Sequence, residues 1–212
     1  MFNKTVNFDM ENSWSDFRII FKTFTLGAPA PQLVLINVPF RNGSLDETDY
    51  FGETKYNDRT LSMDFLINWT EDDPYDIYSN VLNKLNGKRK KIKISADQGW
   101  YYEGRLTVGD LSISDGFWQF SIDATVDPYK YKDIEILFNV YGSKTIQLVC
   151  DYLTTVPTFT TDADMTIDYN GNEFKFEKGT SYNPLLKLRR GGNTMTINTN
   201  GSVRIEYKQG RL

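Results

Sequence analysis

Alternation of apolar and polar residues with a period of two is the feature that most constrains the fold of this chain. Between residues 60 and 67, the apolar side chains of Leu61, Met63, Phe65 and Ile67 fall on one face, as in a half-buried strand. The same alternation recurs in five later runs: Leu111/Ile113, Trp118/Phe120/Ile122/Ala124, Ile146/Leu148/Cys150, Met165/Ile167/Tyr169 and Val203/Ile205/Tyr207. The sequence therefore predicts a mainly β fold.

Turn-forming dipeptides separate several of these runs. They are Asp115-Gly116, Asn170-Gly171 and Asn200-Gly201. Both residues of such a pair tolerate the positive φ of a tight hairpin turn. We therefore expect an antiparallel hairpin at each of the three positions.

A single segment has helical rather than strand spacing, with apolar residues at Tyr78, Val81, Leu82 and Leu85. Asp73 is suited to accept a bond from the first free amides, Pro74 fits the first turn, and Gly87 fits a left-handed exit. We predict a helix at about 74–86 that covers one sheet. The acidic run Glu71-Asp72-Asp73 is interpreted as a cap with favourable charge at the positive end of the helix dipole.

A domain boundary is indicated where the long aromatic strand ends at Asp127-Pro128, because proline cannot donate to a central ladder. Short strands rich in Thr, Asn and Gly follow. We expect two domains, residues 1–134 and 135–212, each with its own small sheet system.

Composition excludes several functions. The chain has no histidine and one cysteine, Cys150, so the usual zinc sites, Ser–His–Asp catalysis and Cys–His catalysis are excluded. We expect no catalytic residues, no metal and no cofactor. A net charge of −4 and a sequence pI near 5.0 argue against a basic nucleic-acid binder. No apolar run has the length of a membrane helix or a signal peptide, so we expect a chain made and kept in the cytoplasm until it is assembled elsewhere, without membrane insertion.

The remaining acid–base chemistry would rest on carboxylates. Asp162 and Asp164 flank Ala163, but the regular Asp-x-Asp-x-Asp-Gly calcium loop is missing, so we interpret them as turn acids. A glycosidase needs two carboxylates that face each other across a cleft, and the sequence offers no paired motif.

The basic run of Lys88, Arg89, Lys90, Lys91 and Lys93 has two interpretations. It can form a phosphate-facing stripe, or it can be the solvated face of a strand in which lysines alternate with isoleucines. We favour the strand face, where lysines at a sheet edge would also block unwanted pairing. In a ring assembly the same residues would form a lumen or charge-pairing face.

Two further motifs have ordinary structural interpretations. Trp100-Tyr101-Tyr102 has the ring content to stack on sugars or bases, but alternation places Tyr101 opposite its neighbours, which favours packing. Arg190-Gly191-Gly192-Asn193 lacks the Lys-Ser/Thr of a phosphate loop and is predicted to be a turn.

The least ordinary segment is 38–60, about twenty polar-rich residues between two strands, which is long for a connection inside a compact domain. Its scattered apolar residues argue against disorder. An arm that packs on a neighbouring molecule accounts for both features. The candidate subunit-interface residues are Phe40, Arg41, Asn42, Gly43, Ser44, Leu45, Tyr50, Phe51, Tyr56 and Arg59.

Blocks of residues within 1–134 resemble the N-terminal signature of the distal tail (Dit) proteins of siphophages. No single block is specific, but their order and spacing together are fairly so. The blocks are Val38-Pro39-x-Arg41-Asn42-Gly43-Ser44-Leu45-Asp46, Phe51-Gly52-x-x-x-Tyr56-x-x-Arg59, Leu85-Asn86-Gly87-Lys88, Tyr101-Tyr102-Glu103-Gly104-Arg105-Leu106 and Asp127-Pro128-Tyr129-Lys130.

The resemblance implies a hexameric ring at the virion tail tip, assembled in the host cytoplasm. Such a ring joins the tail tube protein to a tail-associated lysin or tail spike, and in baseplate-bearing phages it holds receptor-binding proteins. The implied fold is an N-terminal β-sandwich-like domain with one helix and an extended hairpin arm, followed by a small, galectin-like C-terminal β-sandwich. The arm at 38–60 would act as a belt on the adjacent subunit.

Three alternatives remain open. A carbohydrate-binding β-sandwich module would expose an aromatic platform such as Trp100 or Trp118. A glycosidase based on carboxylates would require an activity with no motif in the sequence. A tail tube protein would share the β-sandwich ring, but tube subunits usually lack a second C-terminal domain.

Overall fold

The chain divides into two compact units, residues 1–130 (unit 1) and residues 131–212 (unit 2). The structure is a computed structural model that describes residues 4–50, 52–67 and 73–212. The division lies slightly before the expected boundary at 134/135. The reason is that β11 (Lys130–Asn139) continues without a break across that boundary and belongs to the sheets of unit 2.

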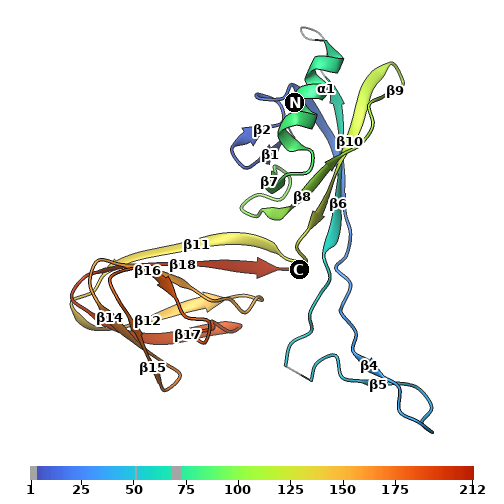
Figure 1. Cartoon of the computed structure of the whole chain (residues 1–212). Coiled ribbons are helices and arrows are strands. Elements are labelled where there is room, and N and C mark those ends of the chain that lie inside the picture. The colour runs from blue at the N-terminus through green and yellow to red at the C-terminus, as the bar shows by residue number, and fades with distance from the viewer. Residues whose placement is uncertain (1–3, 51, 68–72) are drawn as a thin grey trace. The chain divides into compact units, whose positions relative to one another are not determined.

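Eight of the described strands of unit 1 form one antiparallel sheet (Figure 1). Its order is β2-β1-β7-β8-β10-β6-β3, and β9 pairs with β10. Strand β6 lies between β3 and β10, and every second residue of it is buried, as the alternation predicted. The strands are β1 (Val6–Phe8), β2 (Glu11–Asn12), β3 (Ile19–Leu26), β6 (Arg59–Ile67), β7 (Arg89–Ile94), β8 (Tyr102–Val108), β9 (Ser112–Ser114) and β10 (Phe117–Val126).

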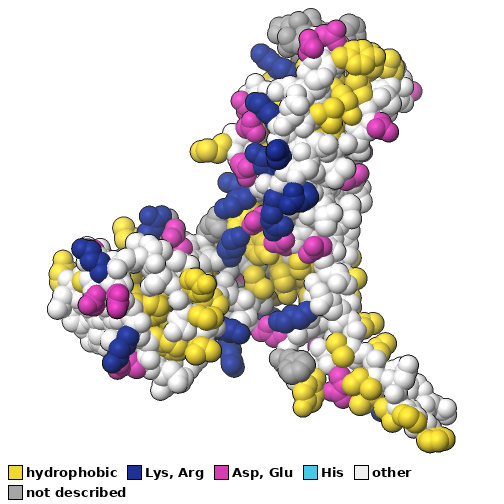
Figure 2. All heavy atoms as spheres, viewed as in Figure 1, with side chains coloured by type: hydrophobic (Ala, Val, Ile, Leu, Met, Phe, Trp, Pro, Cys, Tyr) yellow, Lys and Arg dark blue, Asp and Glu magenta, His cyan; other side chains and the backbone are white. Residues whose placement is uncertain are grey.

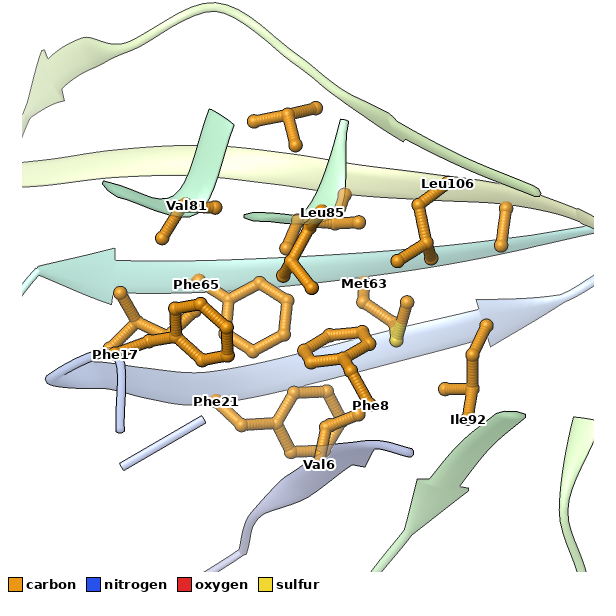
Figure 3. Packing of buried hydrophobic residues seen from close by; sticks show 14 of the residues in the cluster. Val6, Phe8, Phe17, Phe21, Met63, Phe65, Val81, Leu85, Ile92 and Leu106 are labelled. Carbon is orange, nitrogen blue, oxygen red and sulfur yellow. The ribbon is translucent and has the colours of Figure 1, made fainter. Parts of the chain in front are cut away.

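Aromatic rings fill the core of unit 1 (Figure 3). Phe8 and Phe65 are fully buried; Phe65 lies 5.6 Å from Phe21 and Phe8 lies 6.3 Å from Phe17, measured between ring centroids. Burying a Phe side chain contributes roughly 1.5–3 kcal/mol. Because these rings come from β1, the β2–β3 connection, β3 and β6, they hold distant parts of the chain together.

Helix α1 (Pro74–Leu85) lies within the range expected from the sequence. The Asp73 carboxylate accepts a hydrogen bond from the N–H of Tyr75 at 2.8 Å, and Gly87 leaves the helix with φ +72°. The helix buries Ile77, Val81 and Leu85. Sequence spacing had indicated Tyr78 and Leu82 in place of Ile77; both are half-buried at the rim of the same core.

Unit 2 is a small β-sandwich. Within the described residues its strands form two four-stranded sheets, with orders β11-β18-β13-β16 and β12-β17-β14-β15, and a separate apolar core. The mainly β fold class, with α1 as the one helix of the described residues, is confirmed. The remaining strands are β12 (Gly142–Cys150), β13 (Thr158–Thr161), β14 (Met165–Tyr169), β15 (Asn172–Phe176), β16 (Gly179–Tyr182), β17 (Gly191–Thr199) and β18 (Ser202–Arg211).

Two of the three predicted tight hairpins form. Both residues of Asp115-Gly116 and of Asn170-Gly171 have positive φ, and each pair joins strands that are hydrogen-bonded to one another. The prediction for Asn200-Gly201 is wrong, because β17 and β18 belong to different sheets.

Close packing explains why glycine stands at 201 although the turn is not a tight hairpin. A Cβ at this position would lie 2.9 Å from the Cβ of Ala163. Beside it, the Asp162 carboxylate accepts hydrogen bonds from the N–H and the hydroxyl of Ser202, both at 2.7 Å. The crossing between sheets is therefore fixed by Asp162 rather than by a left-handed backbone.

Substitution of Gly104 by Ala is expected to destabilise unit 1 by about 1–3 kcal/mol, the range for overpacking a filled core. A Cβ here would clash with the backbone of β10, lying 2.7 Å from Cα of Val126 and closer still to the carbonyl oxygen of Thr125. All four tryptophans lie in residues 1–130, so tryptophan fluorescence in a denaturant titration reports on unit 1. Thr107→Ala, an exposed position on β8, is the control, and equal midpoints for the two variants would contradict the packing argument.

Candidate functional site

A two-stranded arm continues the β3–β6 hairpin beyond the sheet (Figure 1). Backbone hydrogen bonds join its two limbs along their length. At the base, the Gly27 N–H donates to the Thr60 carbonyl at 2.8 Å; farther out, the Glu47 N–H donates to the Val34 carbonyl at 2.9 Å. Between these, Asn57 bonds Ala30 and Gln32 bonds Lys55, both at 2.8 Å. The outer part contains the short strands β4 (Leu35–Ile36) and β5 (Leu45–Asp46). The arm is therefore defined as residues 27–58.

This arm is longer than the segment 38–60 expected from the sequence. The sequence predicts that the run Leu33-Val34-Leu35-Ile36 is the strand before the arm. Leu35–Ile36 is a strand, β4, but the run lies within the arm and not before it. These residues form the outgoing limb, and all four are exposed. Four apolar residues in succession do not alternate, which is the signal in the sequence that separates this limb from the half-buried strands.

The tip of the arm is a turn at Val38-Pro39-Phe40-Arg41, closed by a hydrogen bond of 3.2 Å from the Arg41 N–H to the Val38 carbonyl. Proline at its second position and a positive φ at its third are typical of a type II turn. The third residue is Phe40, with φ +64° and a fully exposed ring. Glycine adopts this backbone conformation without strain, whereas a bulky residue such as Phe40 does not. The exposed ring of Phe40 is therefore present despite an unfavourable backbone conformation.

The arm exposes apolar side chains on both faces. Leu33 and Leu35 alternate with Val34 and Ile36 along the limb, and the exposed fractions of these four side chains lie between 47% and 60%. Hydrophobic side chains follow the arm in Figure 2. An isolated two-stranded ribbon has no second layer to cover either face. Contiguous apolar surface of this kind marks an interaction site.

The predicted interface residues do not all belong to the arm. Tyr56 lies at its base, with its ring 6.3 Å from that of Tyr129. Arg59 lies in β6, is buried, and stands 5.7 Å above the ring of Tyr102, so it belongs to unit 1 proper. Phe51 lies outside the described residues. The remaining predicted residues lie farther out on the arm than Tyr56: Phe40, Arg41, Asn42 and Gly43 at the exposed tip, Ser44 bonded to the Asn37 side chain, half-buried Leu45, and Tyr50, which is 74% exposed.

The basic run is largely paired within unit 1. Arg89 contacts Asp127 at 2.8 Å and Glu103 at 3.3 Å, and Lys90 contacts Asp9 at 3.0 Å. Strand β7, which carries the run, lies between β1 and β8. The suggestion that its lysines protect a sheet edge is therefore wrong. Strand β7 is an interior strand, and Lys91 and Lys93 lie on the face opposite its buried Ile92 and Ile94.

Local contacts also involve the aromatic rings that were candidates for sugar stacking. Tyr101 and Tyr102 are both buried, and the Tyr102 hydroxyl donates to Asp97 at 2.7 Å. The ammonium of Lys130 lies over the Trp100 ring, 5.3 Å from its centroid. Trp118 meets Tyr75 edge to face at 5.2 Å. These contacts support the packing interpretation for the rings.

The Cys150 thiol is buried, and the carboxylates of Asp162 and Asp164 accept hydrogen bonds within unit 2. Burial raises the pKa of the Cys150 thiol to about 11, so this thiol is neutral at physiological pH. Asp164 accepts a hydrogen bond from the Lys178 N–H at 3.0 Å and, with Asp162, holds turns of unit 2. Glu71 and Asp72 lie outside the described residues. Among the described helices, none is long and apolar enough to cross a bilayer.

Comparison with solved structures gives a likeness over the whole chain. The Dit (gp 19.1) protein of SPP1, described as a paradigm of the hub adsorption apparatus in phages that infect Gram-positive bacteria, aligns with a TM-score of 0.69. The alignment covers 99% of each chain at 13% sequence identity. The chain has the fold of SPP1 Dit. The resemblance drawn from residues 1–134 is thus extended, at the level of the fold, to unit 2.

Other similarities are weak. A designed double-stranded β-helix aligns over 38% of this chain and 99% of its own, with 6% identity and a TM-score of 0.25. The cupin domain of Schizosaccharomyces pombe Cnp3 aligns over 56% and 75%, with 11% identity and a TM-score of 0.26. Neither carries a functional argument. No protein-family model and no curated protein matches the sequence.

Replacing Lys90 by Gln is expected to raise the pKa of Asp9. Partial burial alone would raise this pKa, but the N–H of Lys91 and the ammonium of Lys90 outweigh it and hold the pKa below its ordinary value. The depressed pKa of Asp9 stabilises the folded state at pH values above the pKa of Asp in the unfolded chain. This stabilisation is lost as the pH falls through the lower pKa of the folded state. Carboxyl-carbon NMR titration of Asp9 measures the change. Lys93→Gln is the control, and an unchanged Asp9 pKa in the Lys90 variant would show that the pair does not form.

Proposed function

We propose that this chain is a structural subunit of a phage tail tip, a hub that assembles into a ring with further copies of itself. The observation that carries the proposal is the arm, which exposes apolar side chains on both faces and an aromatic ring at its tip. The fold shared with SPP1 Dit, a hub adsorption protein, supports the same role. A scaffold without catalytic activity accords with a sequence that has no histidine.

The arm is suited to a contact in which two different surfaces meet. The arm extends beyond the sheet of its own unit. In the proposed contact it therefore packs on a surface of the neighbouring copy that is not that copy's arm. Such head-to-tail contacts close into a ring when the rotation between copies allows it. We propose six copies, as in the resemblance from the sequence, with the ring at the virion tail tip after assembly in the host cytoplasm.

The proposed partners follow from a hub position. The ring would join the tail tube protein on one side to a tail-associated lysin or tail-spike protein on the other, with receptor-binding proteins attached in phages that have a baseplate. The basic strand β7 would contribute little to nucleic-acid binding in this arrangement, since Arg89 and Lys90 already contact carboxylates.

A variant with Leu35→Ser, Ile36→Ser and Phe40→Gly is expected to fold normally and remain monomeric. These side chains lie outside both cores, so the unfolding midpoint of unit 1 stays unchanged, and glycine at 40 relieves the positive φ. Light scattering should give the unaltered chain a mass that is a multiple of 24.5 kDa, and the variant 24.5 kDa.

The matched control changes exposed apolar residues of unit 2 to serine, at Leu137, Tyr182 and Leu185. It removes comparable apolar surface but leaves the arm intact, and its mass should equal that of the unaltered chain. An oligomer of unchanged mass in the arm variant, or equal loss of assembly in the control, would rule out the arm as the contact.

A further inference from the structure

The end of unit 1 that lies away from the arm exposes a small apolar surface. We define it as the end patch, formed by Tyr75, Ile113 and Trp118. Tyr75 and Ile113 are 61% and 60% exposed, and Trp118 is half-buried. Figure 2 shows hydrophobic side chains gathered at the end of unit 1 that carries α1 and β9. Neither Tyr75 nor Ile113 belongs to the core of unit 1, so packing of that core does not account for them.

The three side chains of the end patch lie on one face of the sheet. Ile113 of β9 is directly opposite Trp118 of β10, and opposite residues of an antiparallel pair share a face. The ring of Tyr75, in the first turn of α1, meets the Trp118 ring edge to face at 5.2 Å. The patch is therefore one continuous surface, and contiguous apolar surface of this kind marks an interaction site.

The arm and the end patch lie at opposite ends of the same strands. Strand β6 begins at Arg59, where the arm joins the sheet. Its Leu66 pairs with Gln119, the residue after Trp118 in β10. At about 3.3 Å per residue, roughly 23 Å of strand separates the two ends. The arm continues beyond the Arg59 end (Figure 1). A contact between the tip of the arm and the end patch therefore joins two copies of the chain.

The end patch lies in an acidic part of unit 1. Residues 60–83 and 106–129, which include most of β6 and α1 and all of β9 and β10, contain no lysine or arginine. Asp110 and Asp115 flank β9. Asp76 follows Tyr75 on the helix, and all three aspartates are exposed. A partner that carries an aromatic ring together with a positive charge fits a surface of this composition.

The tip of the arm has the matching composition. Phe40 is fully exposed, and the next residue, Arg41, is exposed as well. Arg41 is the one basic residue of the sequence between positions 27 and 54. The acidic residues of the return limb begin only at Asp46, in β5, so the turn at the tip is itself positively charged.

We propose that the tip of the arm of one copy docks on the end patch of the next copy. The Phe40 ring packs on Ile113 and Trp118, and the Arg41 guanidinium lies toward the carboxylates that flank β9. This inference rests on the proposed function and names the surface that receives the arm. Because the tip and the patch are different surfaces, the contact is head-to-tail, as a ring requires.

Light scattering of the full chain over a range of concentrations tests the receiving surface. Tyr75→Ser with Ile113→Ser should move the midpoint of assembly to a chain concentration about tenfold higher or more, as expected when interface anchors are truncated. Phe117→Ser is the matched control. Phe117 is 52% exposed and precedes Trp118 on β10, so its side chain lies on the opposite face of the sheet. The control should assemble like the unaltered chain.

A charge exchange tests the role of Arg41. Arg41→Glu should weaken assembly about tenfold, because like charges then face each other across the contact. Combining it in one chain with Asp110→Lys and Asp115→Asn should restore assembly, and asparagine tolerates the positive φ at position 115. Assembly that stays as weak in the combined variant as in Arg41→Glu would contradict the placing of Arg41.

The outcomes separate this inference from the proposed function. If the Tyr75/Ile113 variant assembles fully while the Leu35/Ile36/Phe40 variant stays monomeric, the arm makes the contact but the end patch does not receive it. Equal weakening by Phe117→Ser would also overturn the end patch. A mass of 24.5 kDa for the unaltered chain at every concentration would overturn both proposals.

Discussion

Pairing of β6 with its two neighbours is the constraint on which unit 1 depends. Its register with β3 runs from Ile67 opposite Ile19 to Leu61 opposite Leu26, and β10 pairs along its other side. Its alternate side chains are buried and contribute Phe65 to the aromatic core. The arm continues this same hairpin, so the sheet that forms the core also fixes where the arm leaves the unit.

Much of the fold was predictable, because burial of one face of a strand or helix leaves a regular pattern in the sequence. The runs around Phe120, Ile167 and Ile205 alternate in the structure as in the sequence, and Asp73 caps the helix. Two predictions, the hairpin at Asn200-Gly201 and the edge position of β7, were wrong because both features depend on contacts between residues far apart in the sequence. Asn200-Gly201 resembles a hairpin turn, yet it crosses between sheets because Asp162 holds Ser202. Similarly, no local signal shows that β7 has neighbours on both sides, since that depends on pairing with β1, far away in the sequence.

The candidate site was predictable in kind rather than in extent. Excess length and scattered aromatic residues indicated an arm near Phe40, but its outgoing limb at 33–36 has the composition of a core strand. The lack of alternation separates this limb from a half-buried strand, but a strand buried on both faces has the same composition. Exposure distinguishes those two, and exposure is a property of the fold.

The central claim is that the arm contacts another copy of the chain. A photo-reactive amino acid at position 40, where the side chain is fully exposed, reports that contact directly. After irradiation of the purified protein, the account predicts covalent species at twice the 24.5 kDa chain mass and above, with the crosslink outside the arm of the second copy. Species confined to the mass of one chain at every protein concentration would contradict it.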